Sequence, residues 1–579
     1  MKFIVNKICV NCGPHDASVT ILKDDKIIAH IQEERHTNIT HDGSPIVSLT
    51  KVKDYIDKFD FVSFTHLFSQ YIDPLPYMRT LQFMGGLDEK VHEIVEHGEL
   101  LHNHHDYHAM CGFAGSGFED AVVVIIDGAG STFDYGKENQ TTYNISLSKF
   151  DIIEKYIVGD GSVVDDSRPS YVKPITNIGA GYCYTAITEC IGFGALECGK
   201  TMGLAPYGED DSRIPELLSI DSGGNKSFTL GQNPRWPWMG DIYAIFNDSL
   251  LWQDPGKWEG KIKKVLGISD EEIEKDPKKY FKNIAYRIQT DYEKYLITTC
   301  ERALSLSKSK NLVLSGGCAL NCVANYKLLK SLPDDINLFI DPVSDDSGVS
   351  IGGLLHEGGI TPQKLGIGFN QKYKWKDLYL GGQLQYEYEL LEGENETDVV
   401  SKDVAELLIE GNIVAIAQGR SEIGPRALGN RSILFDPRVK NGKDIVNTVK
   451  KREFFRPFAG TVLLEHARDW FDMDRLEESP FMSYAIDVLP EKQDLIPSIV
   501  HFGTCRIQTV TRQQNKHYYD LISDFYKQTD VPILFNTSFN LSGDTIAETI
   551  DDALSTLRRS KIEYLYLPEI NKLVYIPNK

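Results

Sequence analysis

Histidine and aspartate residues lie close together in this chain, at spacings typical of metal ligands. The stretch "HHDYH" places His104 and His108 four residues apart, which on a helix puts both imidazoles on one face. The apolar run "AVVVIIDGAGS" is typical of a buried strand that ends at Asp127, and Asp346 follows another strand in "FIDPVSDDSG". Two imidazoles and two carboxylates suit iron(II), zinc or manganese better than calcium. The sequence therefore predicts a divalent metal site, and iron(II) is the favoured ion.

Two alternatives stay open for this cluster. A zinc protease would need a glutamate directly after the first histidine as its general base, but position 105 is a histidine. The other alternative is a partly buried polar helix whose histidines are satisfied within the protein. We favour the metal because three histidines fall within five residues and a strand-end aspartate follows them.

Arginines gather in the last third of a chain whose net charge is −22. In "GRSEIGPRALGNRSILFDPR" and "KKREFFRPFAG" they alternate with glycine, proline and apolar residues, which is typical of a pocket wall rather than of a solvated surface. Guanidinium groups bind phosphate and carboxylate in a bidentate manner, so we predict an anion site. Its candidate cations are Arg420, Arg426, Arg431, Lys451, Arg452, Arg456 and Arg506. After the strand "VPILF", Asn536 and Ser538 offer hydrogen bonds to a polar ligand, with an ordinary polar loop as the alternative.

The composition places limits on the class of protein. With 579 residues, 41% of them hydrophobic, the chain can bury a large core. Its acidic balance argues against an extended nucleic-acid-binding face. No signal-peptide cleavage site and no apolar stretch of about 18 residues is evident, so we expect a cytoplasmic protein. Cys9 and Cys12 form a CxxC without a second pair, and we expect them to be two cysteines of a strand.

The elements that must position these residues follow an α/β pattern. Residues 5–34 are predicted to form a β-meander whose tight polar turn suits an actin-like or hexokinase-like ATPase fold. Later strands end in glycine and aspartate and lead into helices, an arrangement that exposes backbone N–H groups and carboxylates. The segment 366–395 is rich in glycine, tyrosine and charge, and we expect a boundary there. The predicted domains are 1–365 and 386–579.

Nine short stretches, in order along nearly the whole chain, carry a resemblance to a known family. They are "HDAS", "HHDYH", "IIDGAGS", "GKTMGLAPYG", "SGGCALN", "SDDSG", "EIGPRALGNRSIL", "FFRPFAG" and "NTSFN". With these motifs the chain resembles the O-carbamoyltransferases of nodulation, cephalosporin and aminoglycoside biosynthesis. The resemblance implies an actin-like (ASKHA) transfer domain followed by a YrdC-like α/β domain.

The resemblance also implies the reaction. The YrdC-like domain would make carbamoyl adenylate from carbamoyl phosphate and ATP, the latter with magnesium, and release pyrophosphate. The metal-dependent actin-like domain would then transfer the carbamoyl group to an acceptor hydroxyl. The arginine-rich site would accordingly bind ATP and carbamoyl phosphate.

Individual roles carry over by motif. His104, His108, Asp127 and Asp346 match the metal ligands, with Asp345 as the fallback for Asp346. His15 matches a histidine near the transfer site, and its ordinary pKa near 6.5 suits a general base on the acceptor hydroxyl; the alternative is a loop histidine that only orients groups. Lys200 is expected to contact the adenylate. The expected border of the adenylate is formed by Gly128, Gly316, Gly317 and Asn321.

The acceptor is the least defined part. Trp236 and Trp238 are candidates to stack on it, although ordinary packing is the more common role of such tryptophans. A sugar or another natural-product alcohol is the default by resemblance, and DNA would be a partner only if the acceptor is a hydroxymethylated nucleobase. The alternatives for the function are threonylcarbamoyl transfer to tRNA and a non-catalytic regulator that binds nucleotide and metal.

Overall fold

The protein is known from a computed structural model, which describes the larger part of the chain. The described residues are 6–66, 77, 80–81, 104–133, 136–158, 169–175, 179–218, 266–276, 278–357 and 372–577. By their internal contacts they form two compact units, one of residues 1–117 with 341–579 and one of residues 118–340. This division differs from the predicted domains 1–365 and 386–579, which stay a prediction. Within the described part, no helix has the length and apolar character needed to cross a membrane.

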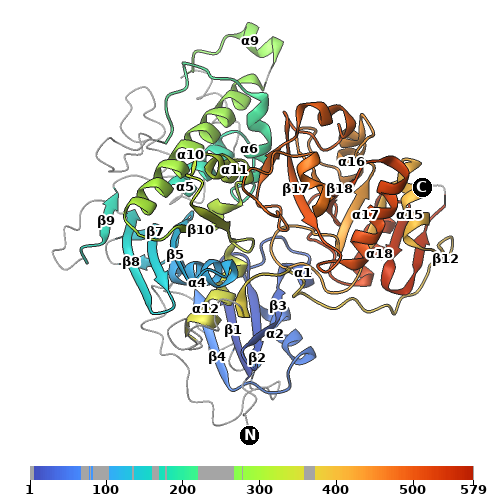
Figure 1. Ribbon diagram of the computed structural model, residues 1–579, viewed down its shortest axis with the longest axis horizontal. Coiled ribbons are helices and arrows are strands. Elements are labelled where there is room, and N and C mark those ends of the chain that lie inside the picture. Colours follow the sequence, from blue (N-terminus) through green and yellow to red (C-terminus); the bar gives the residue numbers. More distant parts are fainter. Residues whose placement is uncertain are drawn as a thin grey trace. The chain divides into compact units, whose positions relative to one another are not determined.

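The N-terminal part of the first unit is built on a four-stranded sheet with the order β3-β2-β1-β4 (Figure 1). Its strands are β1 (Asn6–Cys12), β2 (Ser18–Lys23), β3 (Lys26–Gln32) and β4 (Phe61–His66). The first three form the predicted antiparallel meander, and β4 runs parallel to β1. Asp24 and Asp25 make the tight turn between β2 and β3, both in the left-handed conformation that such turns require. Cys9 and Cys12 lie buried in β1, as the strand prediction expects.

Helices cover this sheet and bring the histidines to it. They are α1 (Glu34–Thr37), α2 (Ile46–Lys51), α4 (His104–Ser116) and α12 (Val349–Glu357). Figure 1 shows α12 between the sheet and α4. The two helices approach very closely, since a Cβ atom on Gly352 would lie 1.8 Å from the carbonyl oxygen of Tyr107. Only glycine fits there, so this contact fixes α4 on α12.

The second unit repeats the same strand pattern in its sheet, whose order is β11-β10-β5-β7-β8-β9, with the short β6 (Thr132–Phe133) beside β7. The strands are β5 (Asp120–Ile126), β7 (Gly136–Ser146), β8 (Lys149–Val158), β9 (Val172–Ile175), β10 (Asn311–Ser315) and β11 (Asn337–Ile340). β5, β7 and β8 are an antiparallel meander, and β10 joins β5 in parallel, as β4 joins β1. Two such sheets are the duplicated core of an actin-like fold, so the predicted fold class is confirmed.

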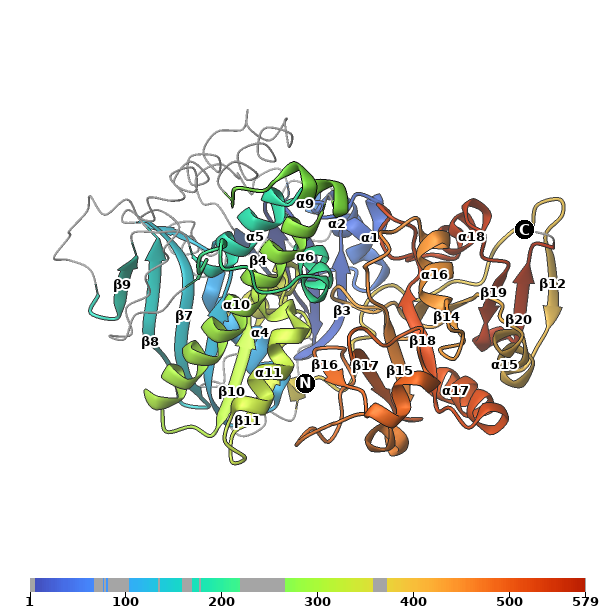
Figure 2. The same cartoon turned by 90° about the horizontal axis from the view of Figure 1, so that it is seen from above.

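Five α-helices of the second unit lie in the described part of the chain, and three of them contact the longest one. They are α5 (Ala180–Cys190), α6 (Cys198–Leu204), α9 (Asp270–Lys275), α10 (Lys279–Ser305) and α11 (Cys322–Ser331). The long α10 contacts α5, α6, α11 and β5 (Figure 2). Its buried residues recur every three or four positions, which is the period of a helix with one face toward a core.

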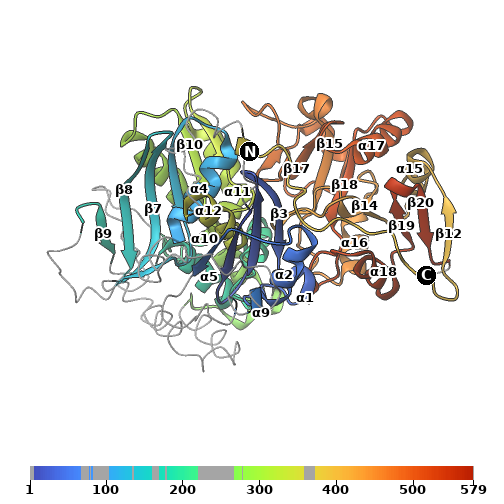
Figure 3. The same cartoon turned by 90° about the horizontal axis from the view of Figure 1, so that it is seen from below.

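The arginine-rich part of the chain forms a nine-stranded mixed sheet in the first unit, with the order β12-β20-β19-β13-β14-β18-β15-β17-β16. Its strands are β12 (Asn395–Asp398), β13 (Val414–Ala417), β14 (Arg431–Phe435), β15 (Ala459–Leu463), β16 (Ala485–Asp487), β17 (Thr504–Val510), β18 (Ile533–Ser538), β19 (Tyr564–Leu567) and β20 (Lys572–Tyr575). Helices lie on both faces, α15 and α17 on one side and α16 and α18 on the other (Figure 3). Their bounds are α15 (Ser401–Ile409), α16 (Gly442–Lys450), α17 (Lys516–Thr529) and α18 (Ile550–Arg559).

The contact between α12 and α4 gives a stability prediction. Gly352→Ala forces a methyl group into the backbone of α4, and overpacking of this kind costs about 1–3 kcal/mol of unfolding free energy. We expect the first thermal unfolding transition, followed by circular dichroism, to shift to lower temperature. Gly199→Ala is the matched control, because its added methyl group meets open space on a helix. An unchanged transition in Gly352→Ala would contradict the close packing.

Candidate active site

The two predicted metal-binding histidines lie in the first two turns of α4. His104 and His108 are completely buried, and their rings are 4.7 Å apart between centroids. The helix places them one turn apart on the same face, as their spacing in the sequence predicts. Burial of two imidazoles at one point is costly unless their nitrogen atoms find partners.

The carboxylate of Asp346 faces these imidazoles. Its Oδ1 atom lies 3.7 Å from Nε2 of His104 and 3.3 Å from Nε2 of His108. These separations match ligands around a shared ion, since two ligands at about 2.1 Å from a tetrahedral metal lie about 3.4 Å apart. The three residues offer ligand atoms within 4.8 Å of one another, and all three are buried. They form a group that can bind a metal.

The surroundings of His108 fit an ion. Neither of its ring nitrogens makes a hydrogen bond within the described part of the chain, although the side chain is fully buried. A metal would satisfy Nε2, which has only the approach of Asp346. Asp345, the fallback ligand, instead accepts a hydrogen bond from the backbone N–H of Ser347 at 3.1 Å. Burial, together with the negative charge of Asp16, raises the pKa of Asp345 to about 7.

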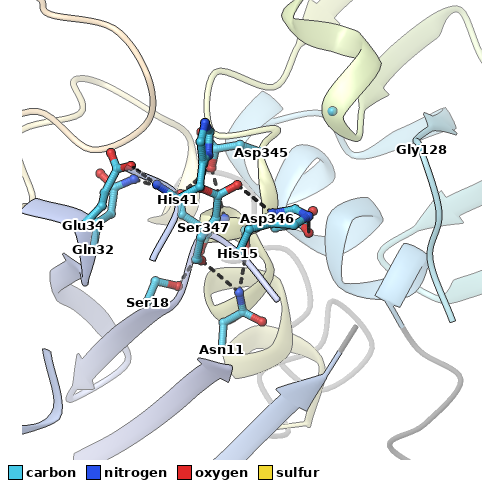
Figure 4. Close-up of polar contacts among 12 residues, drawn as sticks. Asn11, His15, Ser18, Gln32, Glu34, His41, Gly128, Asp345, Asp346 and Ser347 are labelled. Carbon is cyan, nitrogen blue, oxygen red and sulfur yellow. Dashed lines mark hydrogen bonds and ion pairs between the residues drawn. The ribbon is translucent and has the colours of Figure 1, made fainter. Parts of the chain in front are cut away.

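The sheet holds the turn that carries Asp346, a short helix of residues Asp346–Gly348 (Figure 4). The amide of Asn11 on β1 donates to the carbonyl oxygen of Asp346 at 2.9 Å and to that of Asp16 at 3.1 Å. Ser18 on β2 donates to the carbonyl oxygen of Ser347 at 2.8 Å. Buried polar residues of the sheet therefore fix the carboxylate of Asp346 relative to the loop that bears His15.

His15 lies on that loop, between β1 and β2, with its ring between two carboxylates (Figure 4). Its Nε2 atom is 3.6 Å from Oδ2 of Asp346, and its Nδ1 atom is 2.9 Å from Oδ2 of Asp16. The second carboxylate oxygen of Asp16 lies 2.8 Å from Nδ1 of His41. The predicted base thus lies beside the candidate metal ligands.

In the second unit, the predicted strand-end residues come together at one edge of the sheet. Asp127 follows β5, and Gly316 and Gly317 follow the parallel strand β10. The Oδ1 atom of Asp127 accepts hydrogen bonds from the backbone N–H groups of Gly128 at 2.8 Å and of Gly317 at 3.3 Å. Gly316 has a φ of 85°, and a side chain on it would clash with the backbone of β5.

Other predicted residues of the second unit have partners of their own. Asn321 caps α11 through the backbone N–H of Ala324 and pairs its amide with Gln289. Lys200 forms an ion pair with Glu197 at 2.6 Å. Trp236 and Trp238 lie outside the described residues.

Four of the predicted cations form a partly buried cluster beside the nine-stranded sheet. Burial lowers the pKa of Arg452 to about 9, and three neighbouring guanidinium groups add to that shift. These groups belong to Arg456, Arg506 and Arg426. A bound anion would stabilise this group of like charges, because it offsets their mutual repulsion. Lys451, by contrast, is exposed at the end of α16.

The register of the sheet aligns further polar groups with this cluster. Ala459 on β15 pairs with Arg506 of β17 and with Asn536 of β18. Residues in one row point to the same face, so the guanidinium and the amide have only a methyl group between them. Neither Nε of Arg506 nor Oδ1 of Asn536 makes a hydrogen bond among the described residues, although both atoms are buried. Ser538, two positions along β18, accepts a hydrogen bond at its Oγ atom from Lys450.

Arg431 and Arg420 differ from the other predicted cations, because their guanidinium groups are bonded to backbone carbonyls. Arg431 is completely buried and uses its five N–H groups on carbonyl oxygens, including those of Gln418 and Glu548. Arg420 donates to the carbonyl oxygens of Gly381, Ile28 and Leu380. These contacts stabilise the backbone rather than leave the two guanidinium groups for a ligand.

Three residues of the site were missed in the sequence, and a fourth, Lys450, stands in a quoted motif where Lys451 was predicted instead. Asp16 and His41 hold His15. Glu422 organises the "GPRALGNRS" loop, since its Oε1 atom accepts backbone N–H groups of Leu428, Asn430 and Arg431 at 2.7–3.2 Å. Lys450, not its exposed neighbour, is buried against Ser538 and Asn540, and burial lowers its pKa. Asp16 and Glu422 stand inside quoted motifs, but adjacency alone does not reveal their partners.

Matches to two protein-family models identify the family of this chain. The model "Carbamoyltransferase N-terminus" matches residues 60–355, and the model "Carbamoyltransferase C-terminus" matches residues 405–572. The chain belongs to the carbamoyltransferase family. The resemblance in the nine motifs is thereby confirmed, and this family member is an enzyme of the carbamoyltransferase class.

Curated relatives agree with this assignment. The family member is similar to nodulation protein NolNO of Sinorhizobium fredii, at 31% identity over 96% of this chain and 78% of that protein. It is also similar to nodulation protein NolO of Bradyrhizobium diazoefficiens, at 32% identity over 80% of this chain and 77% of that protein. A solved structure of full-length HypF, in the phosphate- and nucleotide-bound form, covers 62% of this chain and 56% of its own at 13% identity. The TM-score of that match is 0.35.

The buried histidines give a prediction on metal content. We expect the purified protein to contain about one equivalent of a divalent transition metal, measured by inductively coupled plasma mass spectrometry. His108→Ala should lose most of it, because that ring offers Nε2 to the shared position. His105→Gln is the matched control, since His105 is a buried histidine of the same helix that is not part of the ligand group. Equal metal in both variants would refute the site, provided that circular dichroism shows both to be folded.

Proposed function

We propose that this carbamoyltransferase is an ATP-dependent O-carbamoyltransferase that works in two half-reactions. In the first, carbamoyl phosphate is hydrolysed to carbamate and orthophosphate, and the carbamate oxygen attacks the α-phosphorus of ATP. Pyrophosphate leaves and carbamoyl adenylate remains. In the second, an acceptor hydroxyl attacks the carbamoyl carbon, AMP leaves, and the hydroxyl proton passes to a base. Family membership supports the transfer, and the two differently charged sites support the division into steps.

The single observation that carries the proposal is the coexistence of a partly buried arginine cluster and a buried imidazole–carboxylate group in one chain. The cluster around Arg452 is suited to the anionic substrates of the first step. The group around Asp346 is suited to the phosphate end of the adenylate through a cation. Neither site alone accounts for both ATP activation and transfer.

In the first half-reaction, the arginine cluster binds ATP, which enters with magnesium, and carbamoyl phosphate. Nε of Arg506 and Oδ1 of Asn536 are buried and make no hydrogen bond among the described residues. Arg426 lies on the loop whose backbone N–H groups donate to Glu422. These groups screen the repulsion between the two anions and orient the carbamate oxygen toward ATP. Arg420 and Arg431 keep the backbone in place rather than touch a substrate.

In the second half-reaction, His15 is the base. Its Nε2 atom points to the metal group and can accept the proton of an acceptor hydroxyl bound there. Gly128, Gly316, Gly317 and Asn321 of the second unit bind the adenylate, and Lys200 contacts its phosphate or carbonyl after leaving Glu197. The acceptor is a sugar or another natural-product alcohol, with a hydroxymethylated nucleobase as the further candidate.

The proposed metal ligands are His104, His108 and Asp346. Asp127 is the proposed fourth ligand, because its motif matches a metal ligand of the family. Iron(II) is the favoured ion, with zinc or manganese as alternatives, since two imidazoles and two carboxylates suit these ions. When bound, the ion supplies positive charge for the phosphate end of the adenylate.

The first half-reaction can be tested without an acceptor. We expect pyrophosphate release from ATP that depends on carbamoyl phosphate, measured with a coupled pyrophosphate assay. Arg506→Gln should lower it by at least about tenfold, because one charge-assisted hydrogen bond is worth about 1.5–3 kcal/mol. Arg438→Gln is the matched control, as its guanidinium is bonded to Asp436 and is not among the charged neighbours of Arg452. Release that needs threonine and bicarbonate would instead favour transfer to tRNA, and no release would favour a regulator.

The variant His15→Asn tests the second half-reaction separately from the first. We expect this variant to keep pyrophosphate release and to lose carbamoyl transfer by about 100- to 10,000-fold, the usual contribution of a general base. Transfer is measured by mass spectrometry of candidate alcohols incubated with enzyme, ATP and carbamoyl phosphate, where a gain of one carbamoyl unit identifies the acceptor. If transfer survives in His15→Asn, His15 is not the base.

A further inference from the structure

We infer that Asp16 and His41 are positioning residues for His15, an inference that rests on the proposed function of His15 as the base. Asp16 holds the ring with the proton on Nδ1 and with Nε2 turned toward Asp346. His41 in turn holds Asp16 from its other side. Neither residue touches the reacting atoms.

The hydrogen bonds determine where the protons lie. Oδ2 of Asp16 is 2.9 Å from Nδ1 of His15, and Oδ1 is 2.8 Å from Nδ1 of His41. An ionised carboxylate can only accept hydrogen bonds, so each imidazole must offer Nδ1–H to it. A neutral His15 ring with its proton on Nδ1 keeps the lone pair on Nε2.

The lone pair on Nε2 lies on the side of the ring that faces the candidate metal ligand Asp346. Nε2 of His15 is 3.6 Å from Oδ2 of Asp346, whose other oxygen faces the imidazoles of α4. Asp16 contacts the other ring nitrogen of His15 and also the ring of His41. A ring in the opposite tautomer would present an N–H group to the site and could not accept a proton there.

The backbone is built to keep these side chains together. The loop of His15 and the loop of His41 are joined by two hydrogen bonds, from Gly13 N–H to Gly43 O at 3.2 Å and from Ala17 N–H to Asp42 O at 2.7 Å. A Cβ atom on Gly43 would lie 2.1 Å from the oxygen of Gly13, so the loops can meet only through glycine. Asp16 and His41 both adopt left-handed backbone conformations, with φ of 55° and 59°.

The charges agree with this arrangement. Burial alone would raise the pKa of Asp16, but hydrogen bonds from His15 and His41 outweigh it and hold the pKa below its usual value. The hydrogen bond to Asp16 also raises the pKa of His41. Asp16 therefore stays an anion, and His41 keeps its Nδ1–H.

The deciding experiment reads the tautomer of His15 directly. Protein labelled with ¹⁵N-histidine and loaded with diamagnetic zinc is studied by long-range ¹H–¹⁵N NMR, and His15 is assigned by the loss of its signals in His15→Asn. We expect the proton on Nδ1 in the unaltered protein. In Asp16→Asn an amide N–H can take the place of the acceptor oxygen, so the proton should move to Nε2. A proton on Nε2 in the unaltered protein, or no change in Asp16→Asn, overturns the inference.

Assays of the two half-reactions provide the second test. Asp16→Asn should keep pyrophosphate release and lower transfer to the acceptor found by mass gain at least about 100-fold, as expected for a base in the wrong tautomer. His41→Gln keeps a donor to Asp16 and should lose far less transfer than His41→Leu. Asp57→Asn, an exposed carboxylate of the same unit, should change neither step. Equal loss of both steps in Asp16→Asn would show a merely structural role.

These readings separate the two hypotheses. If the unaltered protein released no pyrophosphate, the proposed function would fail, whereas the NMR result would still decide the geometry of His15. If release occurred and the tautomer were wrong, the positioning role alone would fail.

Discussion

The arrangement of the candidate active site depends on one buried carboxylate, that of Asp346. A buried charge is costly unless opposite charge or hydrogen bonds surround it, and this carboxylate faces three imidazoles at 3.3–3.7 Å. Such spacing leaves room for an ion. The backbone of Asp346 is meanwhile tied to Asn11 in the sheet, so the ligand position is set before any metal arrives.

Two carboxylates near His15 illustrate how distance assigns roles. Asp16 lies 2.9 Å from the ring and makes a hydrogen bond, which orients the imidazole. Asp346 lies 3.6 Å from the same ring and does not, which leaves its oxygens for other partners. The residue types are the same, and only their placement by the loop and by the turn before α12 distinguishes the orienting acid from the ligand.

The arginine-rich part shows a similar division among guanidinium groups. Arg452, Arg456, Arg506 and Arg426 are held together, and that concentration of positive charge is costly until an anion arrives. Arg431 is completely buried, unlike those four, but its guanidinium donates to backbone carbonyls, so it stabilises the fold instead. Glu422 gathers the intervening N–H groups at its Oε1 atom. The loop is therefore shaped by buried charges on both sides of it.

Sequence by itself determined the α/β class, the actin-like meander of residues 5–34, the family, and the pairing of His104 with His108. These features follow from local periodicity, from turn residues and from spacing along one helix, all of which are written in short stretches. Only the tertiary structure decided that Asp346 rather than Asp345 faces the histidines and that Lys450 rather than Lys451 is buried. It also separated Arg431 from the other arginines and revealed Asp16 and His41 around His15. Neighbouring residues of one type look alike in a sequence, whereas a strand register, a left-handed turn or a glycine contact between helices determines which of them points into the site.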